Sequence, residues 1–219
     1  MKNGKLDGIL KTTQFDGNTT IINYNEGIIR EIKYEKQLIG RKSGNDIFLE
    51  DIISCNSHMY PEFEYKFGDE IVNGNVYSDR CSFSVKNGKL DGKFIVNYAN
   101  TKIKNFEIEF KDGIFDGKVR NWDKLGNLLY EGKMTDGTGE FKLIFEEIIF
   151  KYRYKKNLKY GENSIMFPEH ENFWRNDYYF YGIWLHKKKD FINLEKLEKK
   201  NKTKEIYYYL KDMKRGKKA

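Results

Sequence analysis

A six-residue motif that occurs twice is the feature that most constrains the fold of this chain. Asn-Gly-Lys-Leu-Asp-Gly occupies residues 3–8 and recurs without change at residues 87–92, and a variant, Asp-Gly-Ile-Phe-Asp-Gly, occupies residues 112–117. The last glycines of the second and third copies are 25 residues apart. Two related glycine spacings are 23 and 22 residues, from Gly17 to Gly40 and from Gly117 to Gly139. Such a period is too long for one strand and fits two strands and two turns.

Each period contains two segments of alternating character. In the clearest unit, residues 93–98 precede a turn at 99–101 and a run with apolar residues at 106, 108 and 110. Alternation with a period of two gives one apolar and one polar face. Asn-Gly and Asp-Gly between such runs favour hairpins, because both residues tolerate positive φ. The same template predicts hairpins that pair residues 18–24 with 28–34 and residues 118–122 with 128–133, and it predicts turns at Asp112-Gly113 and Asp116-Gly117.

Residues 41–86 follow the template less closely. Strand-like runs occupy residues 46–49, 63–67, 70–72 and 81–85, and Asn73-Gly74-Asn75 has the composition of another hairpin turn. We interpret this region as two diverged units.

The repeated pattern resembles the bacterial variant of the MORN (membrane occupation and recognition nexus) repeat. That pattern is an aromatic-containing strand, an Asn-Gly turn, a charged alternating strand ending in Tyr or Phe, and a G-x-x-x-G-like turn. Here it is carried by Tyr24 to Gly40, Asn87 to Gly117, and Trp122 to Gly139. The resemblance implies stacked hairpins and a scaffolding or interaction role. Some bacterial members of the family are antitoxin-like, and eukaryotic members have been proposed to touch acidic lipids.

The predicted fold is therefore mainly β: an elongated, twisted antiparallel sheet built from repeated β-hairpins, with a short C-terminal α-helical tail. Residues 1–160 form the repeat sheet, residues 161–185 an aromatic capping segment, and residues 186–219 a basic helical tail. The composition agrees, because aliphatic residues are few while Tyr and Phe number 16 each. Aromatic rings suit a thin, half-exposed sheet.

The tail carries the charge excess of the chain. Residues 186–219 hold 13 Lys and Arg against 5 Asp and Glu, and the formal net charge of the whole chain is +7. A basic tail favours anionic partners, and the alternative is a solvated helix face. The candidate anion-binding residues are Lys187, Lys188, Lys189, Lys199, Lys200, Lys214 and Arg215.

Two helices are expected in this tail. Asp190 or Asn193 is expected to cap the first helix, whose apolar face would hold Phe191, Leu194 and Leu197. Thr203 is expected to cap a second helix, with Ile206, Leu210 and Met213 on its apolar stripe. The stripe is expected to dock on the sheet, and a membrane surface is the alternative.

Aromatic residues are densest between residues 162 and 185. They form either a cap over the last repeat or an exposed binding patch, and we favour the cap. The candidate partner-binding aromatics of the whole chain are Tyr24, Tyr98, Trp122, Tyr130, Trp174, Tyr178 and Trp184.

Motifs for catalysis, cofactors or metals are missing from the sequence. No phosphate-binding glycine loop, nucleophile elbow or zinc-protease motif occurs. Cys55 and His58 have a C-x-x-H spacing, but no second ligand pair lies nearby. His170, in an acidic cluster, is the one position where acid–base chemistry would be sought. We therefore expect no enzyme activity, no cofactor and no metal.

The expected function is protein–protein interaction or scaffolding, with an antitoxin- or immunity-like partner as one form. The alternative is an anionic membrane surface or a nucleic acid that binds the tail. Exposed strand edges also make an edge-to-edge homo-oligomer plausible. The first residues lack a secretory h-region, and no long apolar run occurs, so a cytoplasmic location is expected.

Overall fold

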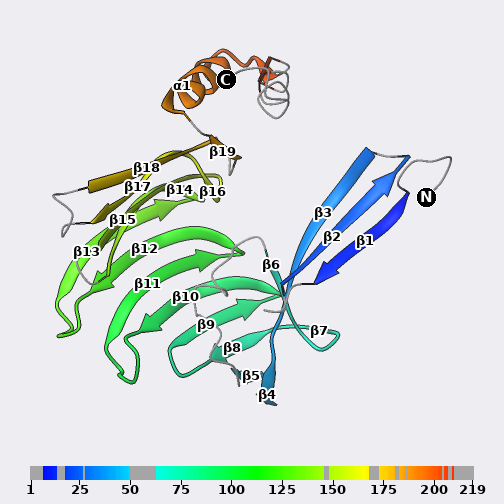
Figure 1. Ribbon diagram of the computed structural model, residues 1–219. Helices are drawn as coiled ribbons and strands as arrows, with labels where there is room; N and C mark the ends of the chain where they lie inside the picture. Colours follow the sequence, from blue (N-terminus) through cyan, green and yellow to red (C-terminus); the bar gives the residue numbers. More distant parts are fainter. Residues whose placement is uncertain are drawn as a thin grey trace. The chain divides into compact units, whose positions relative to one another are not determined.

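The structure is a computed structural model. It describes residues 7–13, 18–26, 28–49, 63–145, 148–167, 173–180, 183–185, 187–203, 205–206 and 209. The chain forms two compact units, Met1–Asp136 and Gly137–Ala219 (Figure 1). The fold class is confirmed: the chain is mainly β, its sheets consist largely of antiparallel hairpins, and a short helix lies near the C-terminus.

Unit 1 contains two runs of paired strands. The first has the order β1-β2-β3-β6-β7, and the second has the order β13-β12-β11-β10-β9-β8-β5-β4. The strands are β1 (Gly8–Thr13), β2 (Asn18–Asn25), β3 (Ile28–Gln37), β4 (Gly40–Ser43), β5 (Asp46–Leu49), β6 (Phe63–Phe67), β7 (Glu70–Ile71), β8 (Gly74–Tyr77), β9 (Cys81–Lys86), β10 (Lys89–Asn97), β11 (Lys104–Lys111), β12 (Ile114–Trp122) and β13 (Leu128–Thr135).

The three predicted hairpins are confirmed. Antiparallel pairing joins β2 to β3, β10 to β11 and β12 to β13. Asn87-Gly88 and Asp112-Gly113 form the tight turns before β10 and β12, and all four residues have positive φ, between 49° and 76°. The Asn-Gly and Asp-Gly signal therefore located these turns correctly, because such residues adopt this backbone at low cost.

The prediction of a turn at Asp116-Gly117 is wrong. These two residues lie inside β12, where the pairing with β11 shifts register between Ile108 and Phe110. Asp91 and Gly92 occupy the same place in β10, where the register with β9 shifts between Leu90 and Phe94. The Asp-Gly that ends the motif is thus a β-bulge in the copies at residues 87–92 and 112–117, where it bends the strand and re-aims the aspartate.

The predicted hairpin turn at Asn73-Gly74-Asn75 is also wrong. The strands on its two sides, β7 and β8, belong to different sheets, so the chain crosses between sheets here. Gly74 has a φ of 153°, and a Cβ at this position would lie 1.7 Å from the carbonyl oxygen of Asn45. A close backbone approach therefore explains the glycine. The crossings also produce two parallel pairs, β3 with β6 and β5 with β8, which the repeat pattern did not predict.

The core of the second strand run follows from the alternation. Phe94, Ile108 and Val119 are directly paired across β10, β11 and β12, and all three are fully buried. Rings continue this apolar face: Phe83 stacks on Phe94 with centroids 5.0 Å apart, and Phe110 lies 4.8 Å from Phe115. The apolar face of the repeats is therefore the buried one.

Unit 2 is an antiparallel sheet with a helix. The strand order is β19-β18-β17-β15-β14, and β16 pairs with β15. Its elements are β14 (Thr138–Phe145), β15 (Ile148–Lys155), β16 (Leu158–Lys159), β17 (Gly161–Phe167), β18 (Phe173–Phe180), β19 (Ile183–Leu185) and α1 (Lys188–Lys199).

Helix α1 docks on this sheet. The sequence predicted such docking for the apolar stripe of the second helix, of which Ile206 packs against the same cluster. Leu194 is fully buried in a cluster with Tyr160, Phe180 and Leu185. Partly buried residues pack against that cluster, namely Tyr178, Phe191, Ile206 and Tyr209. Tyr160 also donates a hydrogen bond from its hydroxyl to Glu198 Oε2 at 2.6 Å, and Lys155 pairs with Glu198 at 2.7 Å. Burial and the bond to Glu198 raise the pKa of Tyr160.

The predicted helix caps are wrong. Helix α1 begins at Lys188 with Lys187 at the N-cap position and no side-chain cap, so Asp190 lies within the first turn. A carboxylate there still complements the helix dipole. Helical backbone resumes at Thr203, which places Lys202 rather than Thr203 before the first helical residue. Leu210 and Met213 lie outside the described residues. Within the described part of the chain, no helix is long and apolar enough to cross a membrane.

Candidate binding surfaces

The first candidate surface is an apolar face of the N-terminal strands β1, β2 and β3. Leu10 pairs with Ile22, and Ile22 pairs with Ile32, so the three form one row across the strands. Directly paired residues share a face of a sheet. Leu10 is 49% exposed and Ile32 is 45% exposed. We call this row, with Tyr24 and Tyr34 beside it on the same face, the N-terminal apolar face.

This face continues into the core of unit 1. Tyr34 pairs with Phe63 in β6, and their rings meet edge to face at 5.9 Å. Phe63 is buried, and Tyr65, two residues on, is fully buried against Phe83 of the other strand run, with ring centroids 5.7 Å apart. One face of these strands therefore runs from a covered part at Tyr65, whose directly paired residue Lys36 is also fully buried, to an exposed part at Leu10.

The opposite face of the same strands is polar. Its rows pair Asn23 with Glu31 and Ile21 with Lys33. Ile9, which is 74% exposed, is paired with Asn23 and is thus separated from other large apolar side chains on its row. Isolated apolar residues are ordinary on protein surfaces, whereas contiguous rows are not. Leu10 and Ile32 are therefore unusual, because they are exposed and lie on one continuous apolar row, whereas Ile9 is isolated.

Strand β1 also presents an edge. Among the described strands it is the last of its run (Figure 1). All six of its residues are exposed. An outer strand leaves every second backbone N–H and C=O without a strand partner, and another strand can pair there. The edge and the N-terminal apolar face are adjacent, since Leu10 belongs to both.

The polar face of β10 to β13 carries an ion-pair network centred on Glu107. This side chain is 1% exposed, and its carboxylate contacts Lys104 at 2.7 Å, Arg120 at 2.8 Å and Lys93 at 3.5 Å. Burial raises the pKa of Glu107, but the hydrogen bond and charge of Lys104 and the charges of Lys93 and Arg120 outweigh it, so the net pKa is lowered. The carboxylate is committed to these cations, which fits a structural role.

Four predicted aromatics lie in unit 1. Tyr24 is half-buried on the N-terminal apolar face. Tyr98 is buried, and its hydroxyl donates to the carbonyl oxygen of Trp122 at 2.7 Å, which anchors the end of β12. Trp122 is half-buried under the ammonium of Lys104, 5.3 Å from its ring. Tyr130 covers Gly132 of its own strand, where a Cβ would lie 2.3 Å from the tyrosine hydroxyl.

Three predicted aromatics lie in unit 2. Trp174 pairs with Met166 and Trp184 pairs with Tyr179, while the placement of the two indole side chains lies outside the described residues. Tyr178 is half-buried and packs against the cluster beneath α1. Burial and the neighbouring Glu162 raise its pKa. The structure thus brings Tyr178 to the helix contact and leaves the predicted aromatics spread over several surfaces.

The predicted anion-binding lysines lie at the two ends of α1. Lys187, Lys188 and Lys189 are exposed at its start, and Lys199 and Lys200 are exposed at its end. Lys199 pairs with Glu195 at 3.3 Å. Lys214 and Arg215 lie outside the described residues, as do Cys55 and all three histidines, His58, His170 and His186. Cys81 is a buried free thiol. No cluster of metal-ligating side chains occurs among the residues that the structure describes.

Comparison with known proteins adds no relative. A scan of protein-family models finds no match to the chain, and a search of curated proteins finds none either. Neither comparison assigns a family. The resemblance to the MORN repeat therefore stays a prediction.

Leu10, Ile32 and Tyr34 are not among the site residues predicted from the sequence. The alternation in residues 18–34 places Ile22, Ile32 and Tyr34 on one face, and this signal was available. Whether that face is covered depends on which strands cross over it, and that is set by the sheet crossings near residues 38 and 73, which have no signal in the repeat.

Proposed function

We propose that the protein is a non-catalytic protein-binding module that docks its partner on the N-terminal apolar face and the β1 edge. The observation that carries the proposal is the row of Leu10, Ile22 and Ile32, which is half-exposed yet continuous with the buried core at Phe63 and Tyr65. Exposed contiguous apolar rows mark interaction sites more often than ordinary surface. This is the scaffold role that the MORN resemblance implies.

A partner strand would add to β1 through backbone hydrogen bonds, while its side chains contact Leu10 and Ile32. This mode gives affinity from the main chain and specificity from alternate side chains. An antitoxin- or immunity-like complex is one form of this proposal, in a bacterial and cytoplasmic setting. A second copy of the chain, paired edge to edge, is the other occupant to be tested.

The chain offers a matched pair of variants for the test. Leu10→Glu with Ile32→Glu places two charges on the N-terminal apolar face, whereas Ile9→Glu places a charge on the opposite face of the same strand. Light scattering of the purified full chain first establishes whether it self-associates. The partner is then captured from the native host with the wild type and both variants. The proposal expects capture that survives Ile9→Glu and is lost with the double variant.

Equal capture by the wild type and the double variant would overturn the proposal. Self-association that disappears with Leu10→Glu and Ile32→Glu would assign the face to a second copy. Circular dichroism spectra and unfolding midpoints of the variants show whether each is folded, and charges on exposed positions are expected to leave the fold intact.

The second candidate function is binding of an anionic membrane surface or a nucleic acid by the tail. What favours it is the exposure of Lys187, Lys188 and Lys189 together with Lys199 and Lys200, on a helix whose apolar side already packs on the sheet. Binding would then be electrostatic. Replacing these five lysines by Gln should abolish binding to anionic vesicles or to duplex DNA, and binding by the wild type should weaken steeply with added salt.

A further inference from the structure

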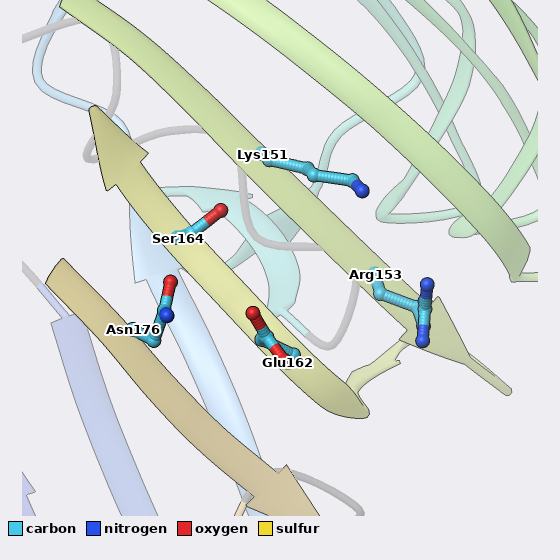
Figure 2. A pocket seen from close by; sticks show the side chains of 5 residues that line it. All are labelled: Lys151, Arg153, Glu162, Ser164 and Asn176. Carbon is cyan, nitrogen blue, oxygen red and sulfur yellow. The ribbon is translucent and has the colours of Figure 1, made fainter. Parts of the chain in front are cut away.

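A polar hollow of about 430 Å³ opens on one face of the unit 2 sheet. Figure 2 shows the five side chains that line it, carried by three neighbouring strands: Lys151 and Arg153 on β15, Glu162 and Ser164 on β17, and Asn176 on β18. The register aligns Lys151 with Ser164 and Ser164 with Asn176, so these three form one row across the sheet. The row offers an ammonium, a hydroxyl and an amide, all of which can donate hydrogen bonds.

Ser164 is the key member of this row. Its residue is only 6% exposed, and it is one of the residues that line the hollow. The hydroxyl points toward the strand that carries Lys151 (Figure 2). A hydroxyl that lines a hollow can donate a hydrogen bond to a ligand there or accept one from it.

The charges around the hollow favour an anion. Lys142 on β14 lies directly opposite Lys151, and like charges in this position repel each other. Glu140 neutralises part of the positive charge, since its carboxylate contacts Lys151 at 3.1 Å and Arg153 at 2.8 Å. Lys142 is exposed. The row of Lys142, Lys151, Ser164 and Asn176 therefore holds two cations and two neutral hydrogen-bonding groups, with no carboxylate among them.

Glu162 sets the orientation of a ligand. It lies one row away, between Arg153 and Tyr178, and pairs with Tyr178 in the β17–β18 register. A carboxylate repels an anion, so the anionic group is directed to the row of Ser164. The remaining polar part of the ligand can then donate to Glu162. The hollow thus has a donor end at Ser164 and an acceptor at Glu162.

We propose that this hollow binds a small ligand through a phosphate or carboxylate group, which Lys151, Ser164 and Asn176 hold by hydrogen bonds. This site is separate from the protein-docking face and does not depend on the proposed function. Charge-assisted hydrogen bonds from a lysine and a hydroxyl are the interactions that proteins commonly use for such groups. Phosphate and carboxylate share this chemistry, and the probes below distinguish them.

The test is an amide NMR titration of the full chain with sodium phosphate and, separately, with sodium acetate, each at constant ionic strength against sodium chloride. We expect saturable shifts of the amides of Lys151, Ser164 and Asn176 with at least one of the two oxyanions. Tighter binding of phosphate would assign a phosphoryl ligand, and equal or tighter binding of acetate would assign a carboxylate.

Three variants complete the test. Ser164→Ala and Lys151→Met should each weaken oxyanion binding by at least about fivefold, because each removes a hydrogen bond to a charged group. Lys196→Met removes an exposed charge of α1 and should leave the affinity unchanged. Lys151 is on the rim, so its variant is expected to fold even if Ser164→Ala does not. Shifts no larger than those with chloride, or equal weakening by all three variants, would overturn the proposal.

Discussion

The carboxylate of Asp91 accepts a hydrogen bond from the backbone N–H of Asp112, 3.3 Å away, at the turn of the next hairpin. The adjacent N–H, of Gly113, donates to the carbonyl oxygen of Leu90 at 2.8 Å. The bulge of one repeat therefore holds the turn of the next. The same bond recurs in unit 1 from Glu26 to Asp7, from Asn87 to Asn73, and from Asp136 to Asp116, at 3.2, 2.7 and 3.4 Å.

This relationship explains the whole hexapeptide. Its Asn-Gly forms the tight turn, and its Asp-Gly, four residues later, forms the bulge whose aspartate reaches the following turn. The aspartate and the turn that it holds are about twenty residues apart, which is one repeat. Repetition of the motif is thus a chain of contacts between neighbouring hairpins, as expected for proteins in which each repeat touches only its neighbours.

Asp91→Ala should destabilise the protein by about 1 kcal/mol, the usual loss for a side-chain cap of backbone N–H groups. Asp91→Asn keeps an acceptor oxygen in the same place and should cost much less. Urea unfolding gives the two free energies, and hydrogen exchange of the Asp112 amide reports the bond directly. Equal stability of both variants, with no faster exchange at Asp112, would show that the bond contributes nothing.

The hairpins and tight turns could be predicted from the sequence because their signals are local. Asn87-Gly88 and Asp112-Gly113 need positive φ, and the flanking alternation needs only one buried face. The role of Asp116 could not be predicted in this way, since its partner is twenty residues away. The crossing at Asn73 could not be predicted either, because its sequence resembles a hairpin turn. In the structure the chain passes from one sheet to the other here, and the side-chain oxygen of Asn73 accepts a hydrogen bond from the Asn87 N–H, as the bulge aspartates do at other turns.

The candidate surfaces likewise combine features with a local sequence signal and features that depend on distant parts of the chain. Alternation predicts that Ile22 and Ile32 share a face, but their exposure depends on the path of β6 and β7. The hollow at Ser164 depends on the register of three strands, and nothing in residues 148–180 indicates that Lys151, Ser164 and Asn176 align. The density of aromatic residues pointed to residues 173–184 as a cap or a binding patch. In the structure Phe180 of this segment is buried in one cluster with Leu194.

Gly117→Ala should destabilise more than Gly126→Ala. Both glycines have positive φ, 132° and 85°, so both substitutions strain the backbone. A Cβ at Gly117 would also lie 2.6 Å from the Cβ of Glu109, whereas none of the described atoms lies within 4 Å of a Cβ at Gly126. We expect about 1 kcal/mol for Gly126→Ala and about 2–4 kcal/mol for Gly117→Ala, measured by urea unfolding. A larger loss at Gly126 would contradict the bulge geometry.

Glu107→Gln should lower the free energy of unfolding at pH 7 by about 1–3 kcal/mol, because Lys104, Lys93 and Arg120 lose the charge that they share. The net pKa of Glu107 is lowered in the folded protein, so its ionisation adds stability at pH values above its ordinary pKa of 4.5. That contribution is lost as the pH falls below this value and through the folded-state pKa. The wild type and Glu107→Gln should therefore differ less at pH 3 than at pH 7.

The matched control for this experiment is Glu131→Gln. Glu131 belongs to the same network through Arg120, at 2.6 Å, but its side chain is 42% exposed, against 1% for Glu107. Exposed ion pairs are screened by water and salt, so this variant should lose much less stability than Glu107→Gln. A difference between wild type and Glu107→Gln that grows toward acid pH would reverse the sign assigned to the pKa shift.

Leu194→Ala should loosen α1 from the unit 2 sheet. Leu194 is fully buried among Tyr160, Phe180 and Leu185, and its truncation would leave a cavity costing about 2–4 kcal/mol. Ile192, on the outer side of the same helix, is 37% exposed, and Ile192→Ala should cost less than about 1 kcal/mol. Hydrogen exchange of the α1 amides measures the docking: it should accelerate in Leu194→Ala and not in Ile192→Ala. Unchanged exchange in Leu194→Ala would mean that the helix is held by the Tyr160 and Lys155 contacts to Glu198 rather than by burial of Leu194.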